Sequence, residues 1–137
     1  MLQNALIDSG PLIALFDKSD SYHKKILDFL KNFKGNLITS ISVVMEVTHM
    51  LDFNVNAQID FLKWIDSGGL KIFKLEEKHF EEIIKLFEKY SDIPMDLADA
   101  SLLIASDELN IKNIISIDSD FNIFKTLRKK YLKNLFI

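Results

Sequence analysis

Short apolar segments alternate with amphipathic segments along this chain of 137 residues. The short segments are nearly continuous in apolar character, as buried strands are, whereas the amphipathic segments repeat apolar residues every three or four positions, as helices do. The pattern predicts strands at 4–8, 36–40, 70–75, 111–118 and 132–137, and helices at 23–33, 41–51, 57–65, 79–90, 96–108 and 120–130. Strands that alternate with helices favour a parallel sheet covered on both faces. The expected fold class is therefore α/β with three α-β-α layers.

The length and composition of the chain indicate one globular domain over residues 1–137. Hydrophobic residues make up 48% of the sequence and charged residues 27%, which is typical of a protein with a packed core. The absence of cysteine excludes a disulfide framework and a thiolate metal site. We expect a soluble, cytoplasmic protein with no membrane contact, because the sequence has no signal peptide and no apolar run near the ~20 residues of a membrane span.

Acidic residues follow the ends of the predicted strands. Asp8 closes the first strand and Asp118 closes the fourth. Glu46 lies on the helix after the second strand, and Asp96 and Asp99 begin a later helix. In an open parallel sheet, ligands bind beyond the carboxyl ends of the strands, where the strand order reverses. We therefore expect these acids to converge on one site.

Each aspartate also has a purely structural explanation, because aspartate is a favoured residue at helix starts. The aspartates at or near the start of a possible helix are Asp8, Asp96, Asp99, Asp118 and Asp120. These segments alone leave open whether the carboxylates cap helices or form a site.

Glu46 is the most informative acid, because it borders the apolar stripe of the predicted helix 41–51. A buried carboxylate must be paired, protonated or bound to a cation. The sequence has no Lys or Arg between residues 35 and 62, so a local ion pair is excluded. A distant partner, or simple exposure to solvent, is the alternative to a cation site.

A cluster of carboxylates has a specific chemistry. The charges repel one another, so some pKa values rise or the cluster holds cations. Oxygen ligands of this kind suit one or two Mg²⁺ ions, or Mn²⁺. A bound divalent cation activates water for the hydrolysis of a phosphodiester. The cluster thus points to a nuclease that needs no His, Ser or Cys nucleophile.

Four segments resemble, in order, the motifs of the PIN-domain nucleases, a family that includes the VapC-type toxins. They are "LIDSGPLIALFD" (6–17), "SISVVMEVTHML" (40–51), "MDLADASLLIAS" (95–106) and "IISIDSDF" (114–121). The resemblance covers nearly the whole chain. It implies a five-stranded parallel sheet in the order 3-2-1-4-5, with the first and fourth strands adjacent.

The resemblance also implies a function and a set of site residues. The function is that of a Mg²⁺-dependent ribonuclease, the toxin of a type II toxin–antitoxin pair. The expected partners are an RNA substrate, a cognate antitoxin and a second copy of the chain in a homodimer. The implied metal ligands and catalytic residues are Asp8, Glu46, Asp99 and Asp118. The residues that could support them are Ser9, Asp96, Ser116 and Asp120.

Other functions remain as alternatives. A PIN nuclease in RNA processing, or one that cuts DNA, would carry the same residues. A receiver domain needs an acid pair after the first strand and an Asp after the third, and the segment 71–75 supplies none. A noncatalytic binding module on this fold would be expected to lack one of the acids, and all of them are present. A phosphate-binding NTPase needs a glycine-rich loop, which is missing.

Basic residues are concentrated near the C-terminus, although the formal net charge of the chain is −3. From residue 121 onward there are five basic residues and no acids. The basic residues are Lys125, Arg128, Lys129, Lys130 and Lys133. Such a strip binds phosphates or forms the solvated end of a helix.

The remaining candidates are histidines and large apolar side chains. His23, His49 and His79 form no ligand pair in the sequence, and structural roles explain them best. The helices 23–33, 41–51 and 57–65 carry more apolar residues than one sheet face needs. The candidates for surplus are Phe29, Phe53, Phe61 and Trp64. They either complete the core or line a groove for an antitoxin helix.

Overall fold

The computed structural model describes residues 2–137. The strands are β1 (Gln3–Ile7), β2 (Gly35–Ser40), β3 (Lys71–Phe73), β4 (Asn113–Ile115) and β5 (Lys133–Asn134). The α-helices are α1 (Ser9–Phe16), α2 (His23–Asn32), α3 (Ile41–Met50), α4 (Val55–Asp66), α5 (Phe80–Lys89) and α6 (Leu97–Leu109). Two 3₁₀ helices complete the list, η1 (Glu77–His79) and η2 (Ser119–Asn122).

The five strands form one parallel sheet in the order β3-β2-β1-β4-β5, which confirms the predicted topology. Leu6 of β1 pairs with Ile38 of β2 on one side and with Ile114 of β4 on the other. The chain therefore moves outward in one direction from β1 to β3, and then returns to the other side of β1 with β4. The reversal places the carboxyl ends of β1 and β4 next to each other.

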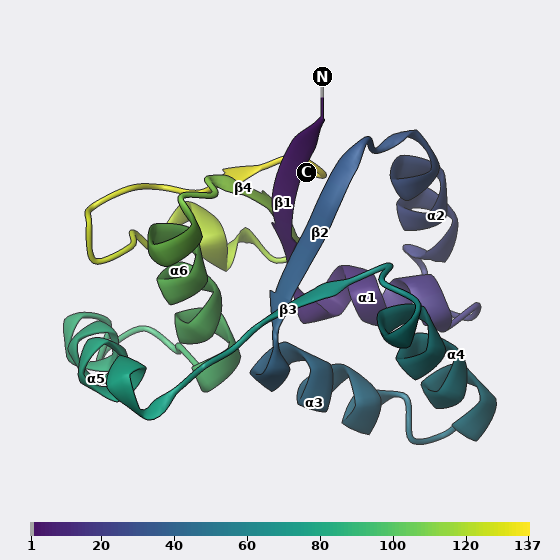
Figure 1. The fold of residues 1–137 in the computed structure, drawn as a ribbon, viewed down its shortest axis with the longest axis horizontal. Helices are drawn as coiled ribbons and strands as arrows, with labels where there is room; N and C mark the ends of the chain where they lie inside the picture. The colour runs from purple at the N-terminus through teal and green to yellow at the C-terminus, as the bar shows by residue number, and fades with distance from the viewer. Residues whose placement is uncertain (1) are drawn as a thin grey trace.

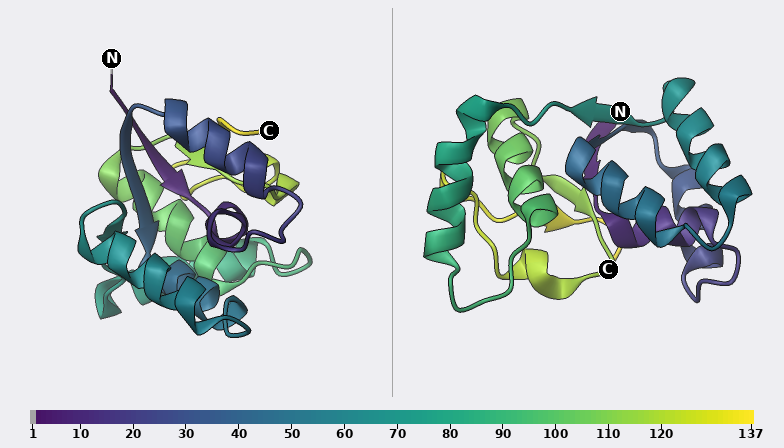
Figure 2. Two further views of the ribbon diagram at one scale, coloured as in Figure 1. Left: turned by 90° about the vertical axis from the view of Figure 1, so that its right-hand side faces the viewer. Right: turned by 90° about the horizontal axis from the view of Figure 1, so that it is seen from below.

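Helices cover both faces of the sheet, so the three-layer α-β-α architecture is confirmed. Figure 1 shows α1, α2 and α4 on one side and α5 and α6 on the other, with α3 below the ends of β1 and β2. Figure 2 shows the same layers from the side and from below. Helix α6 is apolar on most of its surface, and its residues 100–106 are buried, because it lies between the sheet and α5. No helix within residues 2–137 has the length and apolar character needed to cross a membrane.

Side-chain caps begin the helices near the sheet edge. Ser40 accepts a hydrogen bond from the backbone N–H of Val43 at 3.2 Å and so begins α3. The sequence allows either Thr39 or Ser40 to cap this helix, but Thr39 instead donates its hydroxyl to the carbonyl of Ile7 at 2.8 Å. Thr39 thereby ties β2 to β1, because its side chain points into the sheet and not along the helix.

The predicted helix at 120–130 is wrong. Only η2 is helical, and the chain beyond it is extended and then turns, with an antiparallel bridge between Lys125 and Tyr131. Phe121, Phe124 and Thr126 are all buried. These buried residues are spaced by three and then by two positions, which suits a curved loop packed on the core. The apolar residues of the segment nevertheless have the spacing of a helix. The basic residues in this segment are consequently not on a helix end.

The buried faces of two helices also differ from the prediction. The sequence predicts one apolar face for the helix 79–90, formed by Phe80, Ile83, Ile84 and Phe87. In α5, Ile83 and Leu86 are buried, whereas Phe80, Ile84 and Phe87 are exposed. The helix is strongly amphipathic, but α6 covers only one edge of its wide apolar stripe. Periodicity identifies such a stripe without showing which part of it a neighbour will cover.

Helix α4 shows the same effect. The periodicity of residues 57–65 predicts that Ile59 and Leu62 point inward. Instead, Ala57 and Phe61 are the buried residues of α4, and Ile59 and Leu62 are 41% and 46% exposed. Met50 fits the apolar stripe of the predicted helix 41–51, but it is 52% exposed on α3. Phe61 is therefore a core residue and not a surplus side chain, because it packs edge-on against Phe16 of α1 at 5.4 Å between ring centroids.

Candidate active site

Six carboxylates line one hollow at the carboxyl ends of β1 and β4. We call this hollow the acid pocket, and its volume is about 380 Å³. Its lining residues are Asp8, Ser9, Glu46, Pro94, Met95, Asp96, Asp99, Asp118 and Asp120. The fold thus brings together all of the acids that the sequence singled out. No Lys, Arg or His belongs to this lining in the described part of the chain.

Asp8 lies at the centre of the site, directly after β1. Its Oδ1 accepts a hydrogen bond from the backbone N–H of Ser9 at 2.8 Å and so caps α1. Its Oδ2 accepts a hydrogen bond from the Ser116 hydroxyl at 3.1 Å. Burial raises the pKa of Asp8 from 3.8 to about 6, and the charges of Glu46 and Asp118 add to the increase. The two hydrogen bonds oppose this increase without cancelling it.

Ser116 connects β4 to two of the acids and is itself completely buried. Its Oγ accepts a hydrogen bond from the backbone N–H of Asp118 at 3.0 Å while it donates to Asp8. The side chain of Asn134 in turn holds the Ser116 backbone. Asn134 Nδ2 donates to the Ser116 carbonyl at 3.0 Å, and its Oδ1 accepts from the Ser116 N–H at 3.3 Å. The last strand therefore positions the hydroxyl that orients Asp8.

Asp96 and Asp99 form a reciprocal cap at the start of α6. The backbone N–H of Asp99 donates to Asp96 Oδ1 at 2.8 Å, and the N–H of Asp96 donates to Asp99 Oδ2 at 3.2 Å. Partial burial is the first cause that raises the pKa of Asp99 to about 8, and the nearby charge of Asp96 is the second. Asp99 thus both caps α6 and presents a carboxyl group to the acid pocket.

Asp118 caps η2, because its Oδ1 accepts a hydrogen bond from the backbone N–H of Asp120 at 3.0 Å. The side chain of Asp118 is exposed, whereas that of Asp120 is partly covered. Partial desolvation and the charge of Asp118 raise the pKa of Asp120. Of the two aspartates predicted near this helix start, Asp118 is therefore the residue that caps η2.

Glu46 reaches the acid pocket from α3 and is half-buried. Within residues 2–137 no Lys, Arg or His nitrogen lies within 4.0 Å of its carboxylate. A contact that the sequence analysis did not identify sets the position of its helix. The Ser101 hydroxyl on α6 donates to Ser40 Oγ, the cap of α3, at 2.6 Å. The contact fixes the helix of Glu46 against the helix of Asp99.

The donor set of the acid pocket fits a hard divalent cation, because carboxylate oxygens are the ligands that Mg²⁺ and Mn²⁺ prefer. In the arrangement of residues 2–137, no three such side chains yet lie close enough to hold one ion jointly. The charges of Glu46 and Asp118 raise the pKa of Asp8, and the charge of Asp8 raises that of Asp99, so the carboxylates are close enough to interact. Asp118 is exposed and Glu46 half-buried, so both side chains have room to rotate toward an ion.

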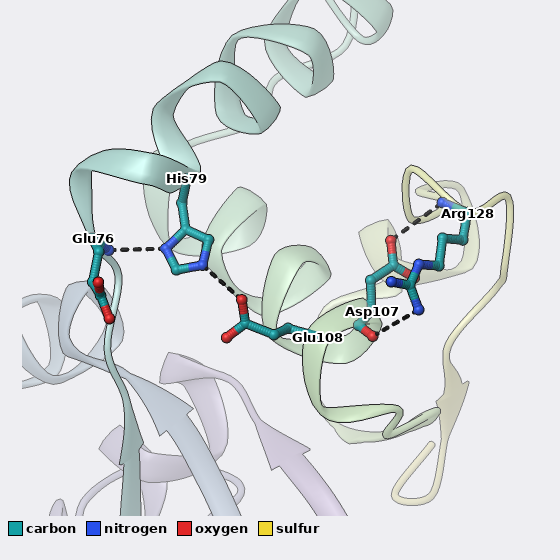
Figure 3. A network of polar contacts seen from close by, with 5 residues as sticks. All are labelled: Glu76, His79, Asp107, Glu108 and Arg128. Carbon is teal, nitrogen blue, oxygen red and sulfur yellow. Dashed lines mark hydrogen bonds and ion pairs between the residues drawn. The ribbon is translucent and has the colours of Figure 1, made fainter.

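The histidines have structural roles or lie at the surface. His79 is 2% exposed; its Nδ1 accepts from the N–H of Glu76 at 2.9 Å, and its Nε2 lies 2.9 Å from Glu108 Oε1 (Figure 3). The ring thereby joins the start of α5 to the end of α6. His23 Nδ1 contacts the carbonyl of Ala14 at 2.7 Å, and His49 is exposed. None of the three lines the acid pocket.

A second hollow, which we call the apolar groove, lies between α1, α2 and α4 and has a volume of about 530 Å³. Its lining residues are Leu15, Phe16, Leu27, Leu30, Lys31, Phe33, Gly35, Leu37, Trp64 and Gly69. Trp64 is half-buried and packs on Phe16 at 5.6 Å between ring centroids. Of the other surplus candidates, Phe29 is half-buried against Phe136, and Phe53 is 62% exposed.

Two kinds of site residue escaped the sequence analysis. Pro94 and Met95 line the acid pocket because the turn before α6 folds over it, and their only signal was the sequence position next to Asp96. Ser101 and Asn134 act through other residues, and a single buried hydroxyl or amide gives no signal of its partner in the sequence.

Comparison with known proteins identifies the family. Residues 5–127 match the PIN domain. Ribonuclease VapC26 of Mycobacterium tuberculosis (strain ATCC 25618 / H37Rv) is 23% identical over 115 residues, which make up 82% of this chain and 85% of that protein.

Solved structures share the fold at low sequence identity. The VapC20 toxin of Mycobacterium tuberculosis, described as cleaving the sarcin-ricin loop, has a TM-score of 0.79 at 16% identity and covers 87% of this chain and 93% of its own. VapBC2 of Rickettsia felis, bound to promoter DNA, has a TM-score of 0.67 at 14% identity, with 96% and 98% covered. A toxin–antitoxin complex from Klebsiella pneumoniae has a TM-score of 0.62 at 19% identity, with 84% and 87% covered. With the matched sequence motif, strand order and arrangement of acids, the chain belongs to the PIN domain family.

Proposed function

We propose that this protein is a Mg²⁺- or Mn²⁺-dependent endoribonuclease and the toxin of a type II toxin–antitoxin pair. The convergence of six carboxylates on one pocket without a compensating basic side chain carries the proposal. Repulsion between the carboxylates destabilises the folded protein, and a bound divalent cation removes much of this repulsion. Membership of the PIN family and the similarity to Ribonuclease VapC26 support RNA as the substrate.

Asp8, Glu46, Asp99 and Asp118 are the proposed metal ligands, because they reach the acid pocket from four different elements. When bound, the cation supplies a Lewis acid for the scissile phosphate and lowers the pKa of the attacking water. The Ser116 hydroxyl orients Oδ2 of Asp8. Burial and the charge of Asp96 raise the pKa of Asp99 to about 8, so this carboxyl group would have to lose its proton in order to ligate a cation.

The supporting residues act on these four acids. Asp96 holds the backbone of Asp99 through the cap of α6, and the N–H of Asp120 fixes one oxygen of Asp118. The backbone N–H of Ser9 binds the oxygen of Asp8 that faces away from Ser116. Asp99 and Asp118 therefore each keep one oxygen on the scaffold, and we assign the other oxygen of each to the cation.

The decisive experiment combines thermal unfolding with RNA cleavage. Mg²⁺ or Mn²⁺ at 100 times its Kd should stabilise the native protein by about 2.7 kcal/mol and raise its Tm. Asp8→Asn keeps the cap of α1, because asparagine is an equally good cap, but removes a ligand charge. We expect this variant to lose most of the metal-induced rise in Tm and to lose RNA cleavage.

Asp28→Asn is the matched control for Asp8→Asn, because Asp28 is exposed on α2 and lies outside the acid pocket. It should respond to the metal as the wild type does. Identical melting curves of the wild type with and without divalent cations would count heavily against a metal site.

The apolar groove is the proposed docking site for the antitoxin. It is lined by aromatic and aliphatic side chains of three helices, and Trp is strongly enriched among residues that dominate binding energy. A helix of the antitoxin could bury its apolar side chains there. Two of the similar structures, from Rickettsia felis and Klebsiella pneumoniae, are complexes of a toxin with its antitoxin.

We also propose that the protein forms a homodimer. Phe80, Ile84 and Phe87 leave an apolar stripe exposed along α5, between 41% and 58% of each side chain. Exposed apolar stripes of this kind commonly mark contact surfaces. Ile84→Lys should shift the sedimentation coefficient to that of a monomer if two copies meet through α5.

A further inference from the structure

The segment after η2 forms a compact hairpin instead of the predicted helix. Lys125 and Tyr131 pair as an antiparallel bridge. Inside the bridge, the N–H of Thr126 donates to the carbonyl of Lys130 at 2.9 Å, and the N–H of Lys129 donates to the carbonyl of Thr126 at 2.9 Å. Lys129 has a positive φ of 63°, as the turn requires. We call residues 125–131 the basic hairpin.

The hairpin is anchored to the rest of the fold on both sides. The N–H of Lys125 donates to the Tyr90 hydroxyl, at the end of α5, at 2.7 Å. On the other side, the N–H of Arg128 donates to Asp107 Oδ2 at 3.2 Å, and its Nη1 donates to the Asp107 carbonyl at 3.3 Å (Figure 3). Thr126, between these anchors, is completely buried. The hairpin thus has a defined position relative to α5 and α6.

The cations of the hairpin are not neutralised within the described chain. Between residues 2 and 137, no carboxylate oxygen lies within 4.0 Å of the side-chain nitrogens of Lys125, Lys129 or Lys130. Lys125 Nζ lies 4.9 Å from the ring centroid of Tyr131, which is 55% exposed. An exposed tyrosine beside free lysines combines a surface for base stacking with cations for phosphates.

A second hollow joins the acid pocket to the end of α5, where the hairpin is anchored. Pro94 and Met95 line the acid pocket, and they also line a neighbouring hollow of about 340 Å³. Tyr90, whose hydroxyl holds Lys125, lines this second hollow. Lys89 Nζ lies 5.2 Å from the ring centroid of Tyr90, so a further cation flanks the same path. Asp92 is the only acid in the lining of this hollow among the described residues.

We propose that the basic hairpin binds the backbone of single-stranded RNA beside the acid pocket, with a base stacked on Tyr131. The proposal rests on the nuclease function proposed above. The acid pocket repels a polyanion, so a nucleic acid needs cations outside the pocket to be held across it. The hollow between the acid pocket and the end of α5, and the exposed Tyr131 ring beside Lys125, favour RNA over an acidic protein segment or an anionic membrane.

The test measures RNA binding separately from cleavage. A fluorescein-labelled single-stranded RNA of 12 nucleotides is titrated in EDTA, its integrity is checked on a gel, and its anisotropy is followed from 50 to 200 mM salt. In the hairpin variant, Lys125, Lys129 and Lys130 are each replaced by Gln. We expect at least a tenfold loss of affinity at the lowest salt, and a salt slope smaller by about 2, which is about 0.7 for each lost phosphate contact.

A matched control removes the same charge elsewhere. The control lysines are Lys18, Lys24 and Lys25, which are exposed. They lie around the start of α2, at the opposite end of the molecule from the hairpin (Figure 1). They also include a lysine beside an aromatic ring, because Lys25 Nζ lies 5.8 Å from the ring centroid of Tyr22. Their triple Gln variant should bind RNA with the wild-type salt slope. Tyr131→Leu, with all charges kept, should weaken binding while leaving the slope unchanged.

The outcomes separate this inference from the proposed function. Equal RNA affinity in the hairpin variant and the wild type would overturn the inference, whether or not the protein cleaves RNA. Equal losses of RNA affinity in both triple variants would also overturn the inference, because RNA binding would then depend only on the net charge of the protein. A variant that keeps RNA binding but loses an antitoxin or anionic vesicles would assign the hairpin to that partner instead. Failure of metal-dependent cleavage, with hairpin-dependent RNA binding intact, would contradict the nuclease and leave the inference standing.

Discussion

The acid pocket and the apolar groove lie on the same small scaffold but are held in shape by different forces. In the acid pocket, hydrogen bonds from backbone N–H groups fix the positions of the side chains, because Asp8, Asp96 and Asp118 each cap a helix. In the apolar groove, packing between side chains fixes their positions. Phe16, for example, packs on both Phe61 and Trp64. Substitutions in the pocket should therefore change charge with little change in shape, and substitutions in the groove should change shape.

The largest effect should come from Asp99→Asn. The substitution removes a ligand charge but leaves an amide that can still accept a hydrogen bond from the N–H of Asp96. We expect RNA cleavage to fall by more than the ~10–100-fold that indirect partners of a metal usually cost. At neutral pH the melting temperature without metal should change little, because Asp99, with a pKa of about 8, carries little charge there. Single-turnover cleavage assays and melting curves on the same preparation test both halves, and an active Asp99→Asn protein would remove Asp99 from the ligand set.

The pH dependence of stability gives the next largest effect. Asp8 and Asp99 have pKa values of about 6 and about 8 in the folded protein, above the ordinary value of 3.8. The folded state therefore binds more protons than the unfolded state between these values, so stability without metal falls as pH rises from about 4 to 8. Asp8 alone accounts for at most about 3 kcal/mol of this loss.

Urea denaturation from pH 5 to 8.5 measures the effect. The difference between the wild type and Asp99→Asn isolates the part that Asp99 contributes, because the histidines titrate in both proteins. Saturating Mg²⁺ should flatten the wild-type curve. A wild type whose stability rises across the same pH range would show that the acid pocket is not electrostatically strained.

Trp64 offers the corresponding test of the groove. It is the only tryptophan in the chain, so its fluorescence reports on the groove alone. Binding of a co-purified antitoxin should shift its emission to the blue, and Trp64→Ala should weaken binding by about 2 kcal/mol, a typical value for a dominant interface residue. Leu62→Ala, on the exposed side of α4, is the control. Unchanged emission on binding would exclude the groove, and unfolding of Trp64→Ala would make Trp64 a core residue.

The smallest effect should come from Asp96. Replacement by Ala removes the cap of α6 and should cost about 0.5–2 kcal/mol of stability, whereas Asp96→Asn should cost much less because asparagine also caps helices. Cleavage should be largely retained in Asp96→Asn. Loss of cleavage in Asp96→Asn with full activity in Asp99→Asn would reverse the assignment of the two residues.

The alternation of elements was sufficient to predict a parallel sheet covered on both faces, and the rule for ligand sites in such sheets predicted that the acids converge. The strand order was implied only by the resemblance to the PIN-domain family. The sequence presented capping and site formation as alternatives for the aspartates. In the structure Asp8, Asp99 and Asp118 take part in caps and line the pocket as well. The two explanations are compatible, since a carboxylate has two oxygens and a cap uses one.

Features that depend on distant packing could not be predicted. The segment after Asp120 has apolar residues at helical spacing, but buried Phe124 and Thr126 hold it as a loop on the core. Which side of α5 is exposed depends on where α6 lies. The two hydrogen bonds between Asn134 and the Ser116 backbone depend on β5, a strand of two residues. None of these contacts leaves a periodic pattern in the sequence.

The short outer strands have a consequence for behaviour at high concentration. Open sheet edges can recruit strands from other molecules and so start aggregation. Here β3 has three residues and β5 has two, and the amide of Asn134 occupies both backbone groups of Ser116 where a longer strand would otherwise continue the ladder. The outer strands therefore offer only short edges for pairing. Asn134, which positions Ser116 at the site, also occupies the backbone groups at which β4 could otherwise accept a further strand residue.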